Sequence, residues 1–453
     1  MAIALISCGD GSRPSAPTPP DGGLEAGPDG SAPDAVSDGA TRGDVPDLPN
    51  ADIEIVLPYG APPHIEALIA IADPAAADIM FLIDTTSSFV EEINNLQQDL
   101  NTLIVPGIRA RISNSSFGVA EFEDFPGSNF GSSTDRPYTL HTAVTSNLTR
   151  VRNAVAKLDD PLGHGGDFPE SGAEALWQTA TGDGYLHAGQ TLVKPYNRQA
   201  LSGGGTLGGV GFRPGALHVI IQATDAPFHS PFDYGAVFPG THSLAEAISA
   251  LNTLDVFVIG VVSNPDMRDD PEVIALATDA VIDPIEGACP TGVNGQDNPP
   301  VGGVCPLVFD IDAKGAGVSD TVVDAVVTLV NALRFSEVYA EVTDDPLGFV
   351  NYIEATTATA PPGINVPLSD DRRAPFDGRA DTFVNVGPGV SLNFSVSLEN
   401  NVLPSAPDYP HIFRVPIEII GDGIVLSTHV LRLIVPPATG DDTGLDDNSD
   451  GGS

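Results

Sequence analysis

The chain has few cysteines, few basic residues and no long apolar segment. Its 453 residues include three Cys, and 19 Lys and Arg stand against 61 Asp and Glu, which gives a formal net charge of −42. Nucleic acids and anionic membranes would repel such a chain, so no nucleic-acid partner is expected. Because no segment approaches the ~20 apolar residues that cross a bilayer, we expect the folded part to be at most tethered to a membrane.

A tether is suggested by the first nine residues, Met-Ala-Ile-Ala-Leu-Ile-Ser-Cys-Gly. They are similar to the end of a bacterial lipoprotein signal, although the usual basic opening is missing. We interpret residues 1–8 as a signal remnant and Cys8 as the lipidated residue. This predicts an exported, lipid-anchored protein of the bacterial cell envelope or outer surface. The alternative is an accidental apolar N-terminus.

Two segments have compositions that do not favour folding. Residues 9–50 consist mainly of Pro, Gly, Ala, Ser and Asp, which cannot bury enough apolar surface to offset the entropy of ordering. Residues 438–453 are similarly small and acidic. We therefore expect a disordered linker before the folded part and a disordered acidic tail after it.

Cys289 and Cys305 remain once Cys8 is set aside. In an exported protein these two residues are expected to form a disulfide that closes a loop rich in Gly, Pro and Asn. Two free thiols are the alternative. A zinc site is not expected, because no histidines cluster with the two cysteines.

The length favours two folded domains. Between residues 76 and 335, apolar runs of strand length, such as 79–83 and 217–223, alternate with helical patterns, such as 90–103 and 322–333. In the helical patterns the apolar residues recur at steps of three and four. This alternation predicts a doubly wound, Rossmann-like α/β domain.

The pattern changes after residue 335, where strand-like runs are separated by Pro, Gly and Asp turns. Residues 336–437 therefore predict an all-β sandwich with antiparallel strands. Residues 51–75 contain two more predicted strands, which are too few to fold alone. Our hypothesis is that they complete the sandwich, so that the α/β domain is inserted between its strands.

Carboxylates and hydroxyls follow two of the predicted strands. The first run ends in Asp-Thr-Thr-Ser-Ser at residues 84–88, and the run 217–223 ends in Thr-Asp at residues 224–225. Loops at the carboxyl ends of parallel strands converge, and hard divalent ions take oxygen ligands. The residues expected to hold such a cation are Asp84, Thr86, Ser88 and Asp225.

This pattern resembles the metal-ion-dependent adhesion site of von Willebrand factor A (VWA) domains, and in detail the A-like domain of integrin β subunits. The family's Asp-x-Pro-Glu motif is matched at residues 167–170, and its Phe-x-Asp-x-Pro element at residues 122–126. The resemblance spans residues 76–337, and several spaced motifs in the family's order are more specific than one. It implies Mg²⁺ or Mn²⁺ at the adhesion site, with Glu170 as a further ligand.

The resemblance also implies two flanking Ca²⁺ sites. Glu91 and Glu92 occupy the place of an acidic pair that builds one of them, and Asp124 and Asp167 match ligands of the other. Two differences from the family stand out. Glu replaces Asp in the acidic pair, and Gly165 stands where the family has an Asn in the flanking site of Asp124 and Asp167.

The function implied by the resemblance is adhesion or protein–protein interaction. A bound cation would keep an outward position for a carboxylate of a protein partner. Each motif also has an ordinary structural interpretation: Asp, Thr and Ser after a strand cap helices, the Glu pair suits a first helical turn, and Asp beside Pro forms turns. A structural subunit of a cell-envelope assembly, with a purely stabilising metal, is the alternative function.

We do not expect an enzyme. The sequence has no His-Glu-x-x-His, no Gly-x-Ser-x-Gly and no Walker loop, and its nine histidines are scattered. A metal-dependent hydrolase remains a weaker alternative, because Glu170 and His229 are near the proposed metal in sequence and a Lewis-acid site can activate water. His164 and His229 flank the site, and as single surface histidines both are interpreted as incidental.

Overall fold

The computed structural model describes residues 53–127, 129–197, 205–362, 364–370, 372, 378–405 and 409–438. The expected signal remnant, Cys8 and the linker 9–50 lie outside the described residues, as does all of the expected tail except its first residue. Among the described residues, no helix has the length and apolar character that a membrane span requires.

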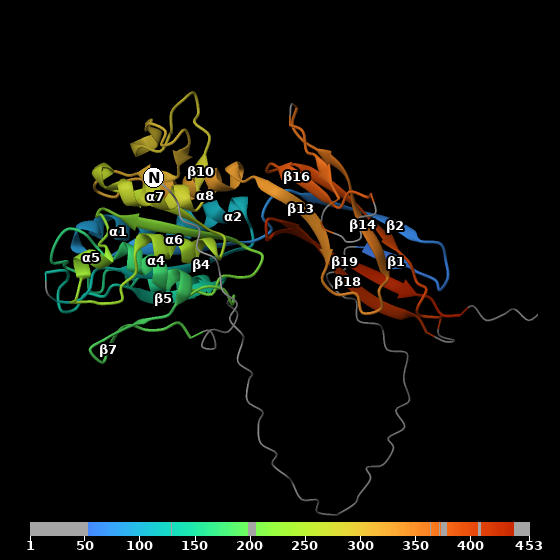
Figure 1. Ribbon diagram of the computed structural model, residues 1–453, viewed down its shortest axis with the longest axis horizontal. Coiled ribbons are helices and arrows are strands. Elements are labelled where there is room, and N and C mark those ends of the chain that lie inside the picture. Colours follow the sequence, from blue (N-terminus) through green and yellow to red (C-terminus); the bar gives the residue numbers. More distant parts are fainter. Residues whose placement is uncertain are drawn as a thin grey trace, which may run out of the picture. The chain divides into compact units, whose positions relative to one another are not determined.

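A six-stranded sheet forms the centre of the α/β domain (Figure 1). Its order is β12-β9-β8-β3-β4-β5, and all neighbours are parallel except β4 and β5. Parallel strands that are covered on both faces read as continuous apolar runs, which is why this part of the sequence lacks polar alternation. The strands are β3 (Ala77–Asp84), β4 (Ser115–Phe122), β5 (Thr139–Thr145), β8 (Leu217–Thr224), β9 (Val256–Val262) and β12 (Val308–Asp310).

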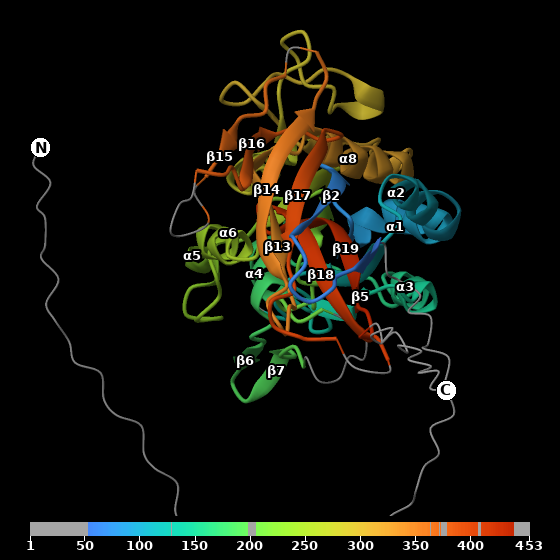
Figure 2. The same cartoon turned by 90° about the vertical axis from the view of Figure 1, so that its right-hand side faces the viewer.

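Helices cover both faces of this sheet, and strand β3 shows why. Its alternate residues divide between two apolar clusters, Phe81 in one and Leu82 in the other. Figure 2 shows α1, α2 and α3 on one side and α4, α5 and α6 on the other. The helices are α1 (Val90–Asp99), α2 (Val105–Arg111), α3 (Leu148–Val155), α4 (Gly172–Thr181), α5 (Pro231–Tyr234), α6 (Leu244–Asn252), α7 (Asp269–Ala277) and α8 (Val318–Ala332).

Short elements fill the connections of the domain. The single helix expected over 90–103 is divided, because a π-helical stretch at Leu100–Ile104 separates α1 from α2. The Gly-rich excursion after α4 contains a hairpin of β6 (Tyr185–His187) and β7 (Gln190–Val193). In the part of the domain that the structure describes, 3₁₀ turns lie at Ser87–Phe89, Pro265–Met267 and Val293–Gly295.

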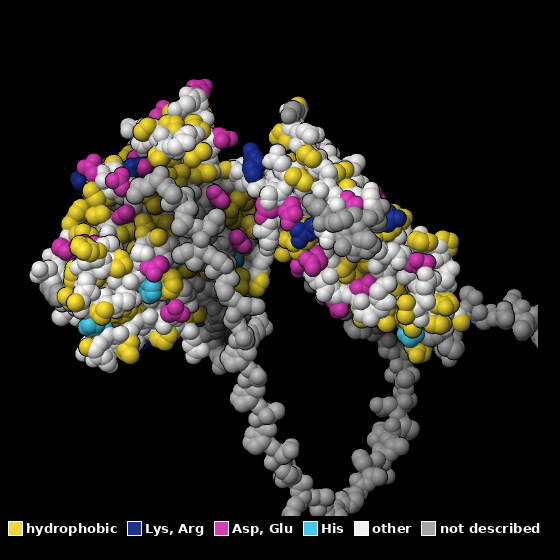
Figure 3. Space-filling model, viewed as in Figure 1, with side chains coloured by type: hydrophobic (Ala, Val, Ile, Leu, Met, Phe, Trp, Pro, Cys, Tyr) yellow, Lys and Arg dark blue, Asp and Glu magenta, His cyan; other side chains and the backbone are white. Residues whose placement is uncertain are grey.

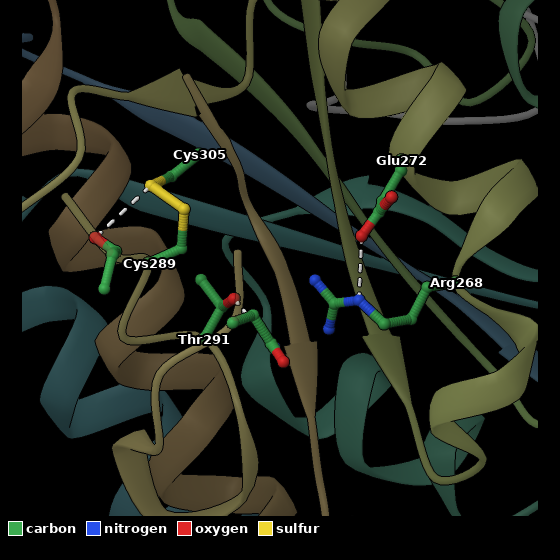
Figure 4. The surroundings of a disulfide bond; sticks show 7 residues. Arg268, Glu272, Cys289, Thr291 and Cys305 are labelled. Carbon is green, nitrogen blue, oxygen red and sulfur yellow. Dashed lines mark hydrogen bonds and ion pairs between the residues drawn. A yellow bond between two sulfur atoms is a disulfide. The ribbon is translucent and has the colours of Figure 1, made fainter. Parts of the chain in front are cut away.

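The disulfide between Cys289 and Cys305 is present, with 5.4 Å between the two Cα atoms (Figure 4). Cys305 lies in β11 (Cys305–Pro306), which pairs with β10 (Val281–Ile282). Both cysteines are buried. The expected pairing is thus confirmed, and the bond closes the loop between the two short strands.

The second part of the fold is all-β, and the strands before the α/β domain pair with it. Strand β1 pairs in parallel with β19, whereas an antiparallel arrangement was expected throughout. Strand β2 pairs antiparallel with β17, with His64 opposite Leu398 (Figure 2). One sheet has the order β1-β19-β18-β13-β16-β15 and the other β14-β17-β2. The strands are β1 (Ile53–Val56), β2 (His64–Ile71), β13 (Phe335–Val342), β14 (Val350–Thr359), β15 (Leu368–Ser369), β16 (Thr382–Val386), β17 (Ser391–Leu398), β18 (His411–Gly421) and β19 (Ile424–Val435).

Candidate metal centre

The register of two neighbouring strands brings the first candidate residues together. Strands β3 and β8 are parallel, and Ile83 pairs with Ala223, so Asp84 and Thr224 end their strands side by side. The Thr224 hydroxyl donates to Asp84 Oδ2 over 2.7 Å. Sequence reasoning did not include Thr224 among the site residues, although its position at the end of the strand, one residue before Asp225, was a usable signal.

The four residues expected to hold the cation form an unbroken row of oxygen atoms. Thr86 Oγ1 donates to Asp84 Oδ1 over 2.6 Å and lies 3.2 Å from Ser88 Oγ. Ser88 Oγ in turn donates to Asp225 Oδ1 over 3.2 Å. Neighbouring ligands of an octahedral Mg²⁺ at 2.0–2.1 Å would lie roughly 2.9 Å apart. These contacts are hydrogen bonds between the side chains, and their lengths are compatible with neighbouring positions in such a coordination shell.

Burial differs across this row. Asp84 and Thr86 are buried, Asp225 is half-buried and Ser88 is exposed. Burial, followed by the negative charge of Asp225, raises the pKa of Asp84 to about 6. The oxygens thus form the floor of a site that opens to solvent on the side of Ser88.

Glu170 is a buried carboxyl held next to the loop that follows Asp225. Its amide donates to the Pro227 carbonyl, and its own carbonyl accepts from the His229 amide, both over 2.9 Å. The side chain is 4 % exposed, and Oε2 has no hydrogen-bond partner among the described residues. Burial, and then the charge of Asp84, raises the pKa of Glu170 to about 11. A nearby cation would offset both effects and allow this carboxyl to ionise.

A second cluster joins Asp124, Asp167 and His229. His229 Nε2 lies 3.2 Å from Asp124 Oδ2 and 3.1 Å from Asp167 Oδ1. Burial lowers the pKa of His229, but the bonds and charges of the two aspartates raise it overall. One ligand atom from each residue lies within 4.8 Å of the others, so the three could hold a metal ion. The structure thus brings together Asp124 and Asp167, the two aspartates that were expected at one of the flanking Ca²⁺ sites.

His229 was interpreted from sequence as an incidental surface histidine, and that interpretation is wrong. The side chain is buried and lies between the two aspartates. Its place four residues after Asp225 gave little indication of this, because the contact depends on the fold of three separate loops. His164 differs, because its backbone amide, and not its ring, is what donates to Asp135.

Asp135 is a further residue that sequence reasoning missed. It is fully buried and accepts the amide of Gly165 over 3.0 Å, so it holds the loop beside Glu170. Gly165 has a φ of +58°, and a Cβ added there would lie 3.1 Å from Glu170 Oε1. A glycine suits this turn, because an added side chain would approach the Glu170 carboxyl.

Glu91 and Glu92 lie in the first turn of α1 but in different surroundings. Glu91 is exposed, whereas Glu92 is 1 % exposed and its backbone lies against Gly315 in the loop before α8. Burial raises the pKa of Glu92 to about 7. A shared metal site for this pair stays a prediction.

Comparisons with known proteins give no family assignment: no family model and no curated protein matches the sequence. Three similar solved structures are a von Willebrand factor type A protein from Catenulispora acidiphila, the pilus adhesin SpaC from Lactobacillus rhamnosus GG in an open conformation, and proximal thread matrix protein 1 from the mussel byssus. Their identities are 14 %, 11 % and 12 %, and their TM-scores 0.31, 0.32 and 0.30. The matches cover 85 %, 83 % and 58 % of this chain, and 72 %, 45 % and 48 % of those chains.

Proposed function

We propose that this chain is a VWA-like protein that binds a divalent cation, Mg²⁺ or Mn²⁺, and uses it to bind a carboxylate of a protein partner. The observation that carries the proposal is the row of oxygens from Asp84 through Thr86 and Ser88 to Asp225, at distances of 2.6–3.2 Å. Glu170, whose charge interacts with that of Asp84, is proposed as a further ligand. Such a donor set, with few carboxylates and several hydroxyls, suits a hard cation.

The open side of the row determines how a partner would bind. Asp84 and Thr86 form the buried floor, and the Thr224 hydroxyl fixes the orientation of the Asp84 carboxyl. Ser88 is exposed, so ligand access is from its side. A bound cation would supply a positive charge there that attracts a carboxylate in a partly dehydrated setting. The expected activity is binding and not turnover.

The proposal includes the location and the domain arrangement of the chain. The disulfide supports an exported protein, because such bonds persist in oxidising compartments. Lipid anchoring through Cys8 at the cell envelope belongs to the same proposal.

The pairing of β1 with β19 and of β2 with β17 supports an α/β domain inserted into a sandwich. Ca²⁺ at flanking sites would be held by Asp124 and Asp167 on one side and by the Glu pair of α1 on the other.

The end-blocked tripeptides acetyl-Gly-Asp-Gly-amide and acetyl-Gly-Asn-Gly-amide, which differ only in the side-chain carboxylate, test the adhesive part of the proposal. Titrated into the protein with Mn²⁺ present, the Asp peptide is expected to bind and the Asn peptide to bind at least about tenfold more weakly, because a charged carboxylate is a stronger ligand of a hard cation than a neutral amide oxygen. EDTA is expected to abolish the binding. If neither peptide binds while the cation does, the adhesive function is contradicted in favour of a metal that only stabilises a structural subunit.

A further inference from the structure

A hollow of ≈ 710 Å³ beside the edge of the α/β sheet has a charge opposite to that of the chain. Arg136, Arg150, Lys157 and Lys194 line it, and its lining contains no Asp or Glu. The chain as a whole has 61 acidic and 19 basic residues. On the face drawn in Figure 3, basic side chains are correspondingly few and scattered. Four cations around one hollow are therefore a local concentration of positive charge.

The four cations come from three separate elements that surround the hollow. Arg150, Asn153, Ala154 and Lys157 recur at helical spacing, which places them on one face of α3 and the turn after it. Lys194 follows β7, and Arg136 precedes β5. All four are exposed, and among the described residues none of them forms an ion pair. Arg136 already donates to the backbone carbonyls of Thr134 and Asp135, and the charges of the other three are available to a ligand.

The floor of the hollow follows an edge strand. Six consecutive residues, 138–143, line it, and β5 is the last strand of its sheet. In the part of the chain that the structure describes, the outer side of β5 hydrogen-bonds to a loop near its end, where the Val144 amide donates to the Val210 carbonyl. His141 on this strand lies 2.6 Å from Glu121, so its ring already has an acidic partner. An edge of this kind offers backbone groups to an added strand.

We propose that this hollow binds an acidic peptide segment of a partner protein, in extended conformation along β5. Carboxylates of the peptide would lie against Arg150 and Lys157 on one wall and Lys194 on the other, and its backbone would extend the sheet. The edge strand favours a peptide over an acidic glycan, because a sugar chain has no regular row of amides to pair with it. The site is independent of the metal centre and goes beyond the proposed cation-dependent binding.

The test uses a fluorescein-labelled octaglutamate and the full chain, with anisotropy measured in EDTA so that no cation can hold the peptide. Binding is expected for the wild type and is expected to fall about tenfold in Arg150→Glu/Lys157→Glu, because two favourable contacts become repulsive. The matched control, Arg152→Glu/Lys314→Glu, changes the net charge equally at exposed residues outside the lining. It is expected to stay within about twofold of the wild type.

Two further ligands decide what the hollow recognises. Octaglutamate with all of its amides N-methylated keeps its charge but has no amide donor on either edge for pairing with a strand, and it is expected to bind at least about tenfold more weakly. Equal binding of this peptide, or tighter binding of an oligogalacturonate, would overturn the proposal in favour of a charge-only or glycan site. No binding of octaglutamate, or equal losses in both double variants, would also overturn it.

Discussion

The candidate metal centre and the basic hollow belong to the same α/β domain and differ in almost every physical respect. The metal centre places acidic and hydroxyl oxygens where parallel strands end, and Asp84 and Thr86 there are buried. The hollow places exposed cations along an antiparallel edge strand. One region would attract a cation and the other an anion, although the net charge is −42. Net charge therefore describes the average surface and not the ligands of individual sites.

The burial of carboxyl groups in the candidate metal centre predicts the largest effect, a pH-dependent decrease in the free energy of unfolding of the metal-free protein. Glu170 has a pKa of about 11 in the fold and an ordinary value of 4.5. Its contribution to stability is therefore fully present below pH 4.5 and is lost as the pH rises towards 11. In EDTA at pH 7, Glu170→Gln is expected to raise the free energy of unfolding by about 3 kcal/mol.

Urea unfolding of both proteins at pH 4 and pH 7 checks this expectation. The gain should be present at pH 7 and nearly absent at pH 4, because Gln resembles the protonated carboxyl. Asp183→Asn, a change at an exposed acid, is the control and should show no such pH dependence. A variant that is less stable than the wild type at pH 7 would show that the carboxylate is ionised and stabilised without a cation.

The hydroxyl that orients Asp84 predicts the next largest effect. Thr224→Val keeps the shape of the side chain but removes the donor to Asp84 Oδ2. Groups that orient a metal ligand are typically worth about 10–100-fold in metal affinity, and we expect a loss at the lower end of this range. Calorimetric titration of Mn²⁺ measures it. Unchanged affinity would mean that Asp84 does not need this bond for its orientation.

A backbone change beside the same site is expected to have a smaller effect. Gly165→Ala introduces a side chain at a φ of +58° and 3.1 Å from Glu170 Oε1. We expect a loss of about 1 kcal/mol in stability, together with weaker cation binding. Gly240→Ala is a suitable control, because its φ is +83° but nothing lies within 4 Å of the added atom. Equal cation affinity in both variants would contradict a role for the Gly165 turn in the site.

The smallest expected effect tests the separation of the two regions. Arg150→Glu/Lys157→Glu reverses charge in the hollow, and the affinity for Mn²⁺ is expected to stay within about twofold, because exposed charges are screened beyond ~8–10 Å. The same titration measures it. A larger change would show that the charges of the hollow influence cation binding at the other site, so that the two regions are not independent.

These two regions also differ in how far the sequence predicts them. The proximity of Asp84, Thr86, Ser88 and Asp225 could be predicted because each lies in a short motif at the end of an apolar run, and parallel strand order then brings the motifs together. Asp124 and Asp167 could be paired only through a family resemblance, and His229 was misjudged because its contacts depend on three loops. The hollow gave no signal, since its cations are spread from residue 136 to 194.

The fold, too, could be predicted from the sequence only in part. The period of apolar residues predicts the α/β domain and the strand-rich segment after residue 335, and the disulfide followed from two cysteines in one loop. The parallel pairing of β1 with β19 could not be predicted, because a four-residue strand has no pattern that determines its direction.

Isothermal titration of Mg²⁺, Mn²⁺ and Ca²⁺ tests the central claim most directly. The wild type is compared with Asp84→Ala/Asp225→Ala and with Asp183→Ala/Asp266→Ala, which removes the same charge at exposed residues. We predict binding in the wild type and in the exposed double variant, and its loss in Asp84→Ala/Asp225→Ala. Equal heats in all three proteins, or no binding in any of them, would contradict a cation site at the ends of β3 and β8.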